Sequence, residues 1–434
     1  MTRFAFIATA MLLAMPVAAQ DLRQVYDLAL EADPVFRAAE ARRRAALESR
    51  PEALAGLLPS LTLSGQRSEA TQKIIASPFS APGRRDFSDT TLALSLSQPL
   101  FRRDRIILLR QAGARVAQAE FEYQQVHQEL LLRVAQAYFD VLAAIDNLSF
   151  AEAEKKAIGQ QLNQTRQRFN VGLTAITDVH EAQARHDQAV ARAIEARNGL
   201  AVARESLRAI IGRLPKTLAR LAPDMPLVRP DPEDEEAWVR QALEQNLALL
   251  AAQQAVEVAR QEVARAGAGH WPSVDLVASH QYSDRGGIFA FEATDTAVGI
   301  QFSLSLYQGG GVSAAARRAA HEYDAALQNL EQVRRATEQG ARSAFLTVLA
   351  DISRVKALKQ VLKSTETALE ATEAGFEVGT RTAVDVLNAR RELYRARSEY
   401  AAARYRYLLQ TLKLKQAAGI LAEADLDRIN AWLK

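Results

Sequence analysis

The sequence predicts a mainly α-helical chain that carries a four-stranded β segment and arose by internal duplication. The segments VGLTAITDV and VGTRTAVDV recur in the two halves, so that Asp178 and Asp385 lie 207 residues apart. Gly172 and Gly379 keep the same offset, and self-similarity at a fixed offset identifies a repeated structural unit. Four short stretches alternate apolar with small residues, and two very long stretches contain no proline.

The offset between the halves changes along the chain and locates an insertion. Phe101 and Tyr307 lie 206 residues apart, whereas Pro59 and Pro272 lie 213 apart, a difference of 7. The first half therefore carries extra residues between Pro59 and Phe101. We expect them in an exposed loop at 77–83, which is rich in proline, glycine and serine.

The organisation of the chain follows from this duplication. We expect a first repeat over residues 20–222, a proline-marked linker over 223–232, a second repeat over 233–418 and a C-terminal segment over 419–434. Residues 1–19 have the pattern of a secretory signal peptide, with cleavage after Ala19. No later stretch approaches the roughly 20 apolar residues of a membrane-spanning helix. The chain contains no cysteine, which rules out disulfides.

Each repeat is expected to run helix, strand, strand, long helix, tip and return helix. The strands are indicated by period-two alternation, in which leucine, isoleucine, valine and phenylalanine mostly take one face and smaller residues the other. The apolar positions are Leu61, Leu63, Leu92, Leu94 and Leu96 in the first repeat and Val274, Leu276, Ile300, Phe302, Leu304 and Leu306 in the second.

The proline-free stretches 102–169 and 312–376 each predict one long helix. At 1.5 Å per residue, about 65 residues make a rod of roughly 100 Å. In the second stretch Val348, Val355, Leu362, Leu369 and Phe376 recur every seven residues, which is the spacing of a coiled coil. The glycines at 172 and 379 can end these helices, and return helices are expected over about 178–211 and 382–418.

The alternating strands suit a wall with lipid on one face and water on the other. A half-buried strand in a soluble sheet would show the same pattern, so both readings stay open from the strands alone. Four strands cannot close a barrel, and lipid tolerates no open sheet edge. Three copies would supply twelve strands and leave a water-filled lumen. The sequence thus predicts a trimeric 12-stranded β-barrel continued by an α-helical coiled-coil barrel.

The chain resembles the TolC family of outer-membrane efflux proteins. The resemblance rests on RFNVGLTAITDVHEAQARHD at 168–187, GFEVGTRTAVDVLNARRELY at 375–394, LSQPLF and LYQGG, and it covers nearly the whole mature chain. It implies a homotrimer in the outer membrane with a large periplasmic extension. It also implies docking to a periplasmic adaptor protein and an inner-membrane ABC or RND-type pump, for drug efflux or type I protein secretion.

The same resemblance implies a gate and a filter at the tips. The family closes its periplasmic entrance through residues that match Thr177, Asp178, Phe376 and Arg381. Phe376 stands where close relatives have tyrosine, so closure must rely more on the Asp178–Arg381 ion pair and on packing.

The family's acidic cation filter matches Asp385 and Asn388. Asparagine at the second position departs from the family pattern, and it leaves three formal charges per trimer rather than six. The surfaces that meet the adaptor match the tip residues Val171, Gly172, Leu173, Val378, Gly379 and Thr380.

Simpler roles for the same residues remain open. Asp178 followed by Glu181 has the pattern of a capping box, and an acid at Asp385, three residues after Thr382, favours a helix N-terminus. The glycine tips would equally serve as plain helix reversals.

The composition argues against other classes of function. With 54 basic and 51 acidic residues mixed along the chain, the net charge of +3 indicates a solvated surface and no nucleic-acid partner. The six histidines form no HExxH motif, and neither a phosphate-binding glycine loop nor a nucleophile elbow is present. We therefore expect no enzyme, no catalytic residue, no metal site and no cofactor. The rivals to a duct are a structural coiled-coil surface protein without a pore, and a single-chain porin, which needs at least eight strands.

Overall fold

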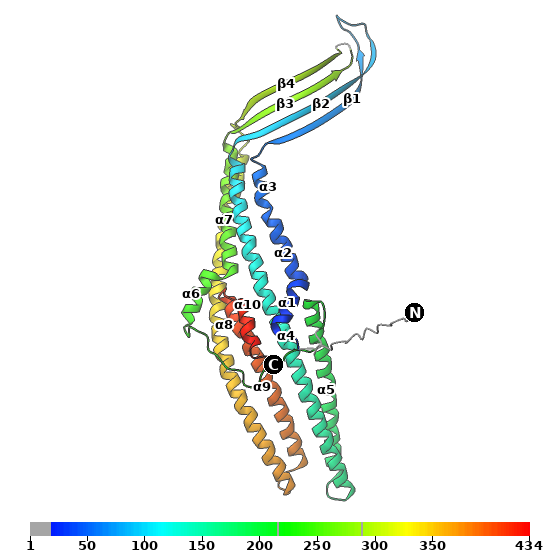
Figure 1. Cartoon of the computed structure of the whole chain (residues 1–434), viewed down its shortest axis with the longest axis vertical. Helices are drawn as coiled ribbons and strands as arrows, with labels where there is room; N and C mark the ends of the chain where they lie inside the picture. The colour runs from blue at the N-terminus through cyan, green and yellow to red at the C-terminus, as the bar shows by residue number, and fades with distance from the viewer. Residues whose placement is uncertain (1–18, 215–216, 288–289) are drawn as a thin grey trace, which may run out of the picture. The chain divides into compact units, whose positions relative to one another are not determined.

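The structure is a computed structural model that describes residues 19–214, 217–287 and 290–434 (Figure 1). The expected signal peptide, apart from Ala19, lies outside the described residues. The chain divides into two compact units. The helical unit comprises Met1–Ala38, Val126–Asn246 and Glu338–Lys434, and the sheet unit comprises Ala39–Gln125 and Leu247–Thr337. Each unit contains segments from both halves of the sequence.

Helices dominate the described residues, and four strands interrupt them there in two pairs. In order, the elements are α1 (Leu22–Ala32), α2 (Pro34–Leu47), α3 (Ser49–Ala55), β1 (Ser60–Ile74), β2 (Gly83–Arg102), α4 (Arg103–Asn170), α5 (Ile176–Ile211), α6 (Glu235–Gln245), α7 (Leu247–Gly267), the short 3-10 helix η1 (Ala268–His270), β3 (Ser273–Arg285), β4 (Phe291–Ser303), α8 (Gly311–Glu377), α9 (Ala383–Ala417) and α10 (Glu423–Asn430).

The predicted rods and strands are confirmed, with one correction at a strand end. Helices α4 and α8 begin and end within one residue of the proline-free stretches, and the loop after β1 includes most of the expected insertion. Leu304 and Leu306, expected in the last strand, lie beyond β4, which ends at Ser303. The neighbouring strand β3 starts at Ser273, which pairs with Ser303. Pro272 precedes it and has no backbone N–H to donate, so the ladder stops there.

The four strands form one antiparallel sheet in the order β1-β2-β3-β4. Its register places the large apolar residues of neighbouring strands on one face, here called the apolar face. Leu61 pairs with Leu96, which pairs with Ala278, which pairs with Val298. On the opposite, polar face most of the aligned residues are small or polar, such as Thr62, Ser95, Ser279 and Ala297, and Val277 is an apolar exception.

The apolar face is exposed to solvent in the single chain. Leu63 is 67% exposed and Ile300 is 70% exposed, with Leu61, Val298 and Phe302 similarly open. An apolar patch of this kind on a folded protein marks a surface that something else covers. None of the helices in the described ranges is long and apolar enough to cross a membrane.

The helical unit has a core in which buried tyrosines tie helices to the chain segments around them. Tyr138 on α4 donates to the Ala219 carbonyl at 2.8 Å, and Tyr405 on α9 donates to Asp146 at 2.7 Å. Burial raises the pKa of both hydroxyls, so they remain protonated donors. Besides Tyr138, the fully buried large side chains here are Leu22, Tyr26, Leu130, Leu131, Phe139, Leu142, Leu207, Tyr407, Leu408, Leu412 and Leu426.

A buried carboxylate fastens α10 to α9. Asp425 is 6% exposed and accepts hydrogen bonds from Lys415, from Arg428 and from the Ala422 backbone N–H. Burial acts to raise the pKa of Asp425, but these donors outweigh it, so the pKa is lowered. The C-terminal helix is thus held by a charge that must stay ionised.

We predict that Asp425→Asn lowers the free energy of unfolding by about 2–3 kcal/mol, because it leaves the half-buried Lys415 without a counter-charge. Since the folded-state pKa of Asp425 is lowered, its stabilisation is full above the unfolded pKa of about 3.9 and is lost as pH falls through the lower folded value. Denaturant titration of the helical circular dichroism at neutral and acidic pH measures both effects. Asp427→Asn, on the exposed side of α10, is the matched control and should change stability by no more than about 0.5 kcal/mol.

Candidate functional site

The two helical hairpins of the helical unit reverse through the same backbone motif. In the α4–α5 tip the Leu173 N–H donates to the Arg168 carbonyl at 2.8 Å, and the Gly172 N–H donates to the Phe169 carbonyl at 2.9 Å. This pair of bonds is a Schellman motif, which places a residue of positive φ just after the helix. Gly172 has a φ of 77°, which explains the glycine.

The α8–α9 tip repeats this geometry at an offset of 207 residues. The Thr380 N–H donates to the Gly375 carbonyl at 2.8 Å, the Gly379 N–H donates to the Phe376 carbonyl at 3.2 Å, and Gly379 has a φ of 80°. Val171 and Val378, which precede the two glycines, are 69% and 75% exposed. Both tips therefore present a rigid turn with an exposed apolar side chain.

Helix α9 starts with a complete capping box. Thr382 Oγ1 accepts from the Asp385 N–H at 3.2 Å, and the Asp385 carboxylate accepts from the Thr382 N–H at 2.9 Å. The bonds from Thr382 come first in lowering the pKa of Asp385, and the Arg381 charge adds to them. The expected helix-start role of Asp385 is therefore confirmed, and its negative charge is stabilised.

Helix α5 starts differently, and the capping box expected at Asp178 and Glu181 is wrong. The helix begins at Ile176 with Ala175 as its N-cap, so Asp178 is its third residue. Ala175 occupies the place of Thr382 and has no side-chain oxygen to offer. The Asp178 carboxylate instead accepts a hydrogen bond from the Thr174 hydroxyl.

The remaining gate and filter positions also lie at the tips. Thr177 is exposed in the first turn of α5, and Arg381 is exposed just before α9. Asn388 lies one turn after Asp385 on α9 and is half-buried. Within one copy, the described residues place no carboxylate within ion-pair distance of Arg381. Asp178 and Arg381 are thus not brought together in the single chain.

The two tips do meet at Phe376, through a residue that the sequence did not single out. The guanidinium of Arg168, near the end of α4, lies 4.8 Å from the centre of the Phe376 ring. A cation over an aromatic face is attracted to its π electrons. Arg168 therefore joins the first hairpin to the gate position of the second.

A second overlooked feature is a polar bond across each hairpin, 17 residues apart in sequence. Arg166 donates to Gln183 at 2.5 Å in the first hairpin, and Arg390 donates to Glu373 at 2.9 Å in the second. The offset of 207 maps Arg166 onto Glu373 and Gln183 onto Arg390, with donor and acceptor exchanged. Applying the repeat offset to polar residues, rather than to tips alone, would have found this pair.

The hairpins also share a small apolar cluster. Leu387 on α9 packs with Ile158 and Leu162 on α4 and with Ala182 and Ala189 on α5. Arg390 adds a bond to the Ala157 carbonyl at 3.2 Å. The first turns of α9 are therefore packed against both α4 and α5.

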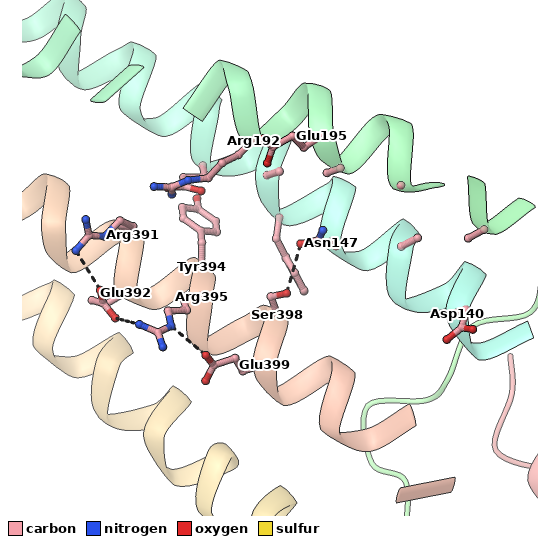
Figure 2. Close-up of a pocket in the computed structure, with 17 residues that line it drawn as sticks. Asp140, Asn147, Arg192, Glu195, Arg391, Glu392, Tyr394, Arg395, Ser398 and Glu399 are labelled. Carbon is pink, nitrogen blue, oxygen red and sulfur yellow. Dashed lines mark hydrogen bonds and ion pairs between the residues drawn. The ribbon is translucent and has the colours of Figure 1, made fainter. Parts of the chain in front are cut away.

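Further along the same helices lies a groove of about 850 Å³ between α4, α5 and α9 (Figure 2). Arg192 on α5 reaches Glu154 on α4 at 2.7 Å, and on α9 Arg395 contacts both Glu392 and Glu399. These charges largely neutralise one another. Burial raises the pKa of Asp140, at one end of the groove, above its ordinary value. In the part of the chain that the structure describes, no three metal-ligating side chains gather.

Comparison with known proteins agrees with this geometry. A family model for "Outer membrane efflux protein" matches residues 25–213 and, separately, 238–420. The chain is 39% identical over 427 residues to the outer membrane protein TolC of Vibrio cholerae, covering 97% of this chain and 96% of that one. It is also 39% identical over 427 residues to TolC of Escherichia coli, covering 95% and 85%.

Further matches concern a secretion protein and solved structures. The alkaline protease secretion protein AprF of Pseudomonas aeruginosa is 34% identical over 416 residues, with 94% and 86% covered. The crystal structure of VceC from Vibrio cholerae superposes with a TM-score of 0.78 at 21% identity, covering 92% and 96%. The CmeC channel of Campylobacter jejuni gives 0.80 at 16% identity, covering 95% and 90%. The fold is therefore that of outer-membrane channels, and this chain belongs to the outer membrane efflux protein family, located in the outer membrane with a periplasmic extension.

Proposed function

We propose that three copies of this chain form the outer-membrane exit duct of an efflux pump or a type I secretion system. The observation that carries the proposal is the sheet, which has one apolar face, one polar face and two unpaired edges. Strands β1 and β4 each have a single neighbour. In hydrocarbon every backbone N–H and C=O must be paired, so the sheet needs further strands to close.

Three copies satisfy this requirement with twelve strands, and the arrangement assigns each face a role. The apolar face, with Leu63 and Ile300, would meet lipid, and the polar face, with Thr62 and Ser279, would line a water-filled lumen. A single-chain porin does not fit, because the described residues contain four strands and such a barrel needs at least eight. A coiled-coil surface protein does not account for the sheet.

The names of the matching proteins support the proposed adaptor and pump partners. One relative is named for protease secretion and the matching family model for outer-membrane efflux, which supports a periplasmic adaptor and an inner-membrane ABC or RND-type pump as partners. The exposed tip residues Val171, Gly172 and Leu173, with Val378, Gly379 and Thr380, offer apolar turns for the adaptor to meet. The role is passive conduction, and no catalytic step, metal or cofactor is assigned to any residue.

For the gate, the single chain suggests a link between copies. Arg381 has no carboxylate within ion-pair distance among the described residues, although its charge acts on Asp385, and Asp178 accepts a hydrogen bond from Thr174, so an Asp178–Arg381 ion pair would join neighbouring protomers. Phe376 would add the packing contact with Arg168, and Thr177 lies beside Asp178. Each exposed ion pair contributes only about 0–1 kcal/mol, which suits an entrance that an adaptor must open.

The duct itself is tested with the full-length protein extracted from outer membranes. We expect a heat-sensitive trimer band on gels and discrete ion conductance after insertion into a planar lipid bilayer. A monomer without conductance would refute the duct. Deleting the gene and comparing secreted proteins with drug tolerance then identifies the cargo.

For the gate, we predict that Arg381→Ala or Asp178→Ala raises the mean conductance of the trimer. Each pair contributes at most about 1 kcal/mol, so the ratio of open to closed entrances should rise up to about fivefold per pair. Single-channel recording measures the effect. The control is Glu370→Ala, which removes an exposed carboxylate of α8 away from the tips. If both gate variants conduct like the parent protein, there is no ion-pair latch.

For the filter, we predict that Asp385→Asn lowers cation selectivity and block by multivalent cations, whereas Asn388→Asp increases both, because it restores six carboxylates per trimer. Asparagine at 385 keeps an oxygen that can accept the Thr382 N–H bond. Because the pKa of Asp385 is lowered, parent selectivity should persist on acidification to about pH 4. Reversal potentials under a salt gradient measure the selectivity, and an unchanged value in both variants places the charge ring elsewhere.

A further inference from the structure

A small pocket, here called the seam pocket, lies along the contact between α4 and α5 in the helical unit. Its volume is about 330 Å³, at the lower end of the range for small-molecule pockets. Val141, Ile145 and Leu148 line it from α4, and Leu200 and Leu207 line it from α5. Spacings of three, four and seven residues put each set on one face of its helix. The two helices therefore give the pocket apolar walls.

The segment that follows α5 closes the seam pocket on a third side. Leu218 and Arg220, two residues apart, both line the pocket. Between them, the Ala219 carbonyl accepts a hydrogen bond from the buried Tyr138 hydroxyl of α4 at 2.8 Å. The Ala219 N–H donates to the Gln20 carbonyl at 3.0 Å. These bonds hold the third wall against α4, so the pocket is a built part of the helical unit.

Two arginines of the seam pocket have no acidic partner. Arg204 and Arg220 line the pocket and are exposed, and neither has a carboxylate within ion-pair distance among the residues that the structure describes. Glu152 is the acidic residue of the lining, and it is already paired with Lys155 at 3.1 Å and with Arg197 at 2.6 Å. Positive charge is therefore in excess at the rim of an apolar pocket.

The seam pocket faces away from the side of α5 that a neighbouring copy would cover. Ile194 and Val202 are 62% and 58% exposed, which marks their side as the unpartnered apolar face of the helix. With 3.6 residues per turn, Leu200 and Arg204 each lie about 160° around the helix from Val202. A neighbouring copy packed on Val202 would therefore leave the pocket open.

We propose that the seam pocket binds a medium-chain fatty acid, with its carboxylate on Arg204 and Arg220 and its acyl chain between the apolar walls. Carboxylate oxygens accept charge-assisted hydrogen bonds from guanidinium groups, and burial of the chain removes apolar surface from water. At about 30 Å³ for each non-hydrogen atom, the volume of a water molecule in the liquid, the pocket holds a chain of about ten atoms. This binding is separate from conduction, so its test measures no transport.

The test uses the full-length protein in lipid nanodiscs, because detergent tails would compete for an apolar pocket. The probe is decanoate that carries a diazirine at the end of its chain, and mass spectrometry maps the peptides that it labels on illumination. We expect label within residues 141–148 and 200–207, displaced by unlabelled decanoate. For Arg204→Gln with Arg220→Gln we expect about tenfold weaker binding, or about 1.4 kcal/mol, since each exposed ion pair contributes about 0–1 kcal/mol.

A matched variant and two further ligand comparisons separate charge from chain. Arg208→Gln with Arg213→Gln removes two exposed arginines that do not line the seam pocket, and binding should stay at the parent level. Decanol with the same diazirine should bind the parent protein about tenfold more weakly than decanoate, and the Arg204 and Arg220 variant should bind it unchanged. From hexanoate to decanoate each added methylene should tighten binding up to about fourfold, and tetradecanoate should gain nothing further.

The proposal is overturned if the label misses the pocket peptides of the parent protein, as it would if a neighbouring copy covered the pocket or if the probe only entered the surrounding bilayer. It is also overturned if the Arg204 and Arg220 variant binds decanoate as tightly as the parent protein. Equal loss in the Arg208 and Arg213 control would make the effect one of net charge and refute the site. Circular dichroism confirms that every variant is folded.

Discussion

The pairing of backbone groups at the sheet edges is the constraint on which the rest of this architecture depends. Strands β1 and β4 each leave one side of their backbone unpaired in the single chain. An unpaired N–H or C=O in hydrocarbon costs several kcal/mol, so a sheet with an apolar face cannot enter a membrane until both edges are covered. Copies of the same sheet offer the simplest cover. The polar face then becomes the inside of a closed wall, and the helices that continue from the strands are multiplied with it.

The parts of the fold that depend on local chemistry could be predicted from the sequence. Proline-free stretches gave the long helices to within one residue, because proline excludes itself from a helix interior. Gly172 and Gly379 marked the tips, because the Schellman motif needs a positive φ there. The end of β4 could not be read from its own residues. Leu304 and Leu306 continue the alternation, but Pro272, just before the neighbouring strand β3, ends the ladder.

In the candidate site, too, features set by residues close in sequence were predictable and contacts between distant residues were not. The role of Asp385 at the start of α9 was predictable, because a capping box involves residues three apart. The partner of Asp178 was mispredicted, because the N-cap oxygen present at Thr382 is missing at Ala175. The contact between Arg168 and Phe376 joins residues far apart in the chain, and the sequence gives no local signal for it. The gate and filter roles remain predictions, since they concern contacts between copies.

The bonds that cross the two hairpins have an unequal response to salt. Arg166 meets the neutral amide of Gln183, whereas Arg390 meets the charged carboxylate of Glu373, whose side chain is 39% exposed. Mobile ions screen a partly exposed ion pair more than a bond to a neutral acceptor. Rising ionic strength is therefore expected to weaken the bond across the second hairpin more than the bond across the first. In a ring of three copies, the salt-sensitive second hairpins would alternate with the first hairpins. The bonds at the entrance would then weaken at three evenly spaced positions.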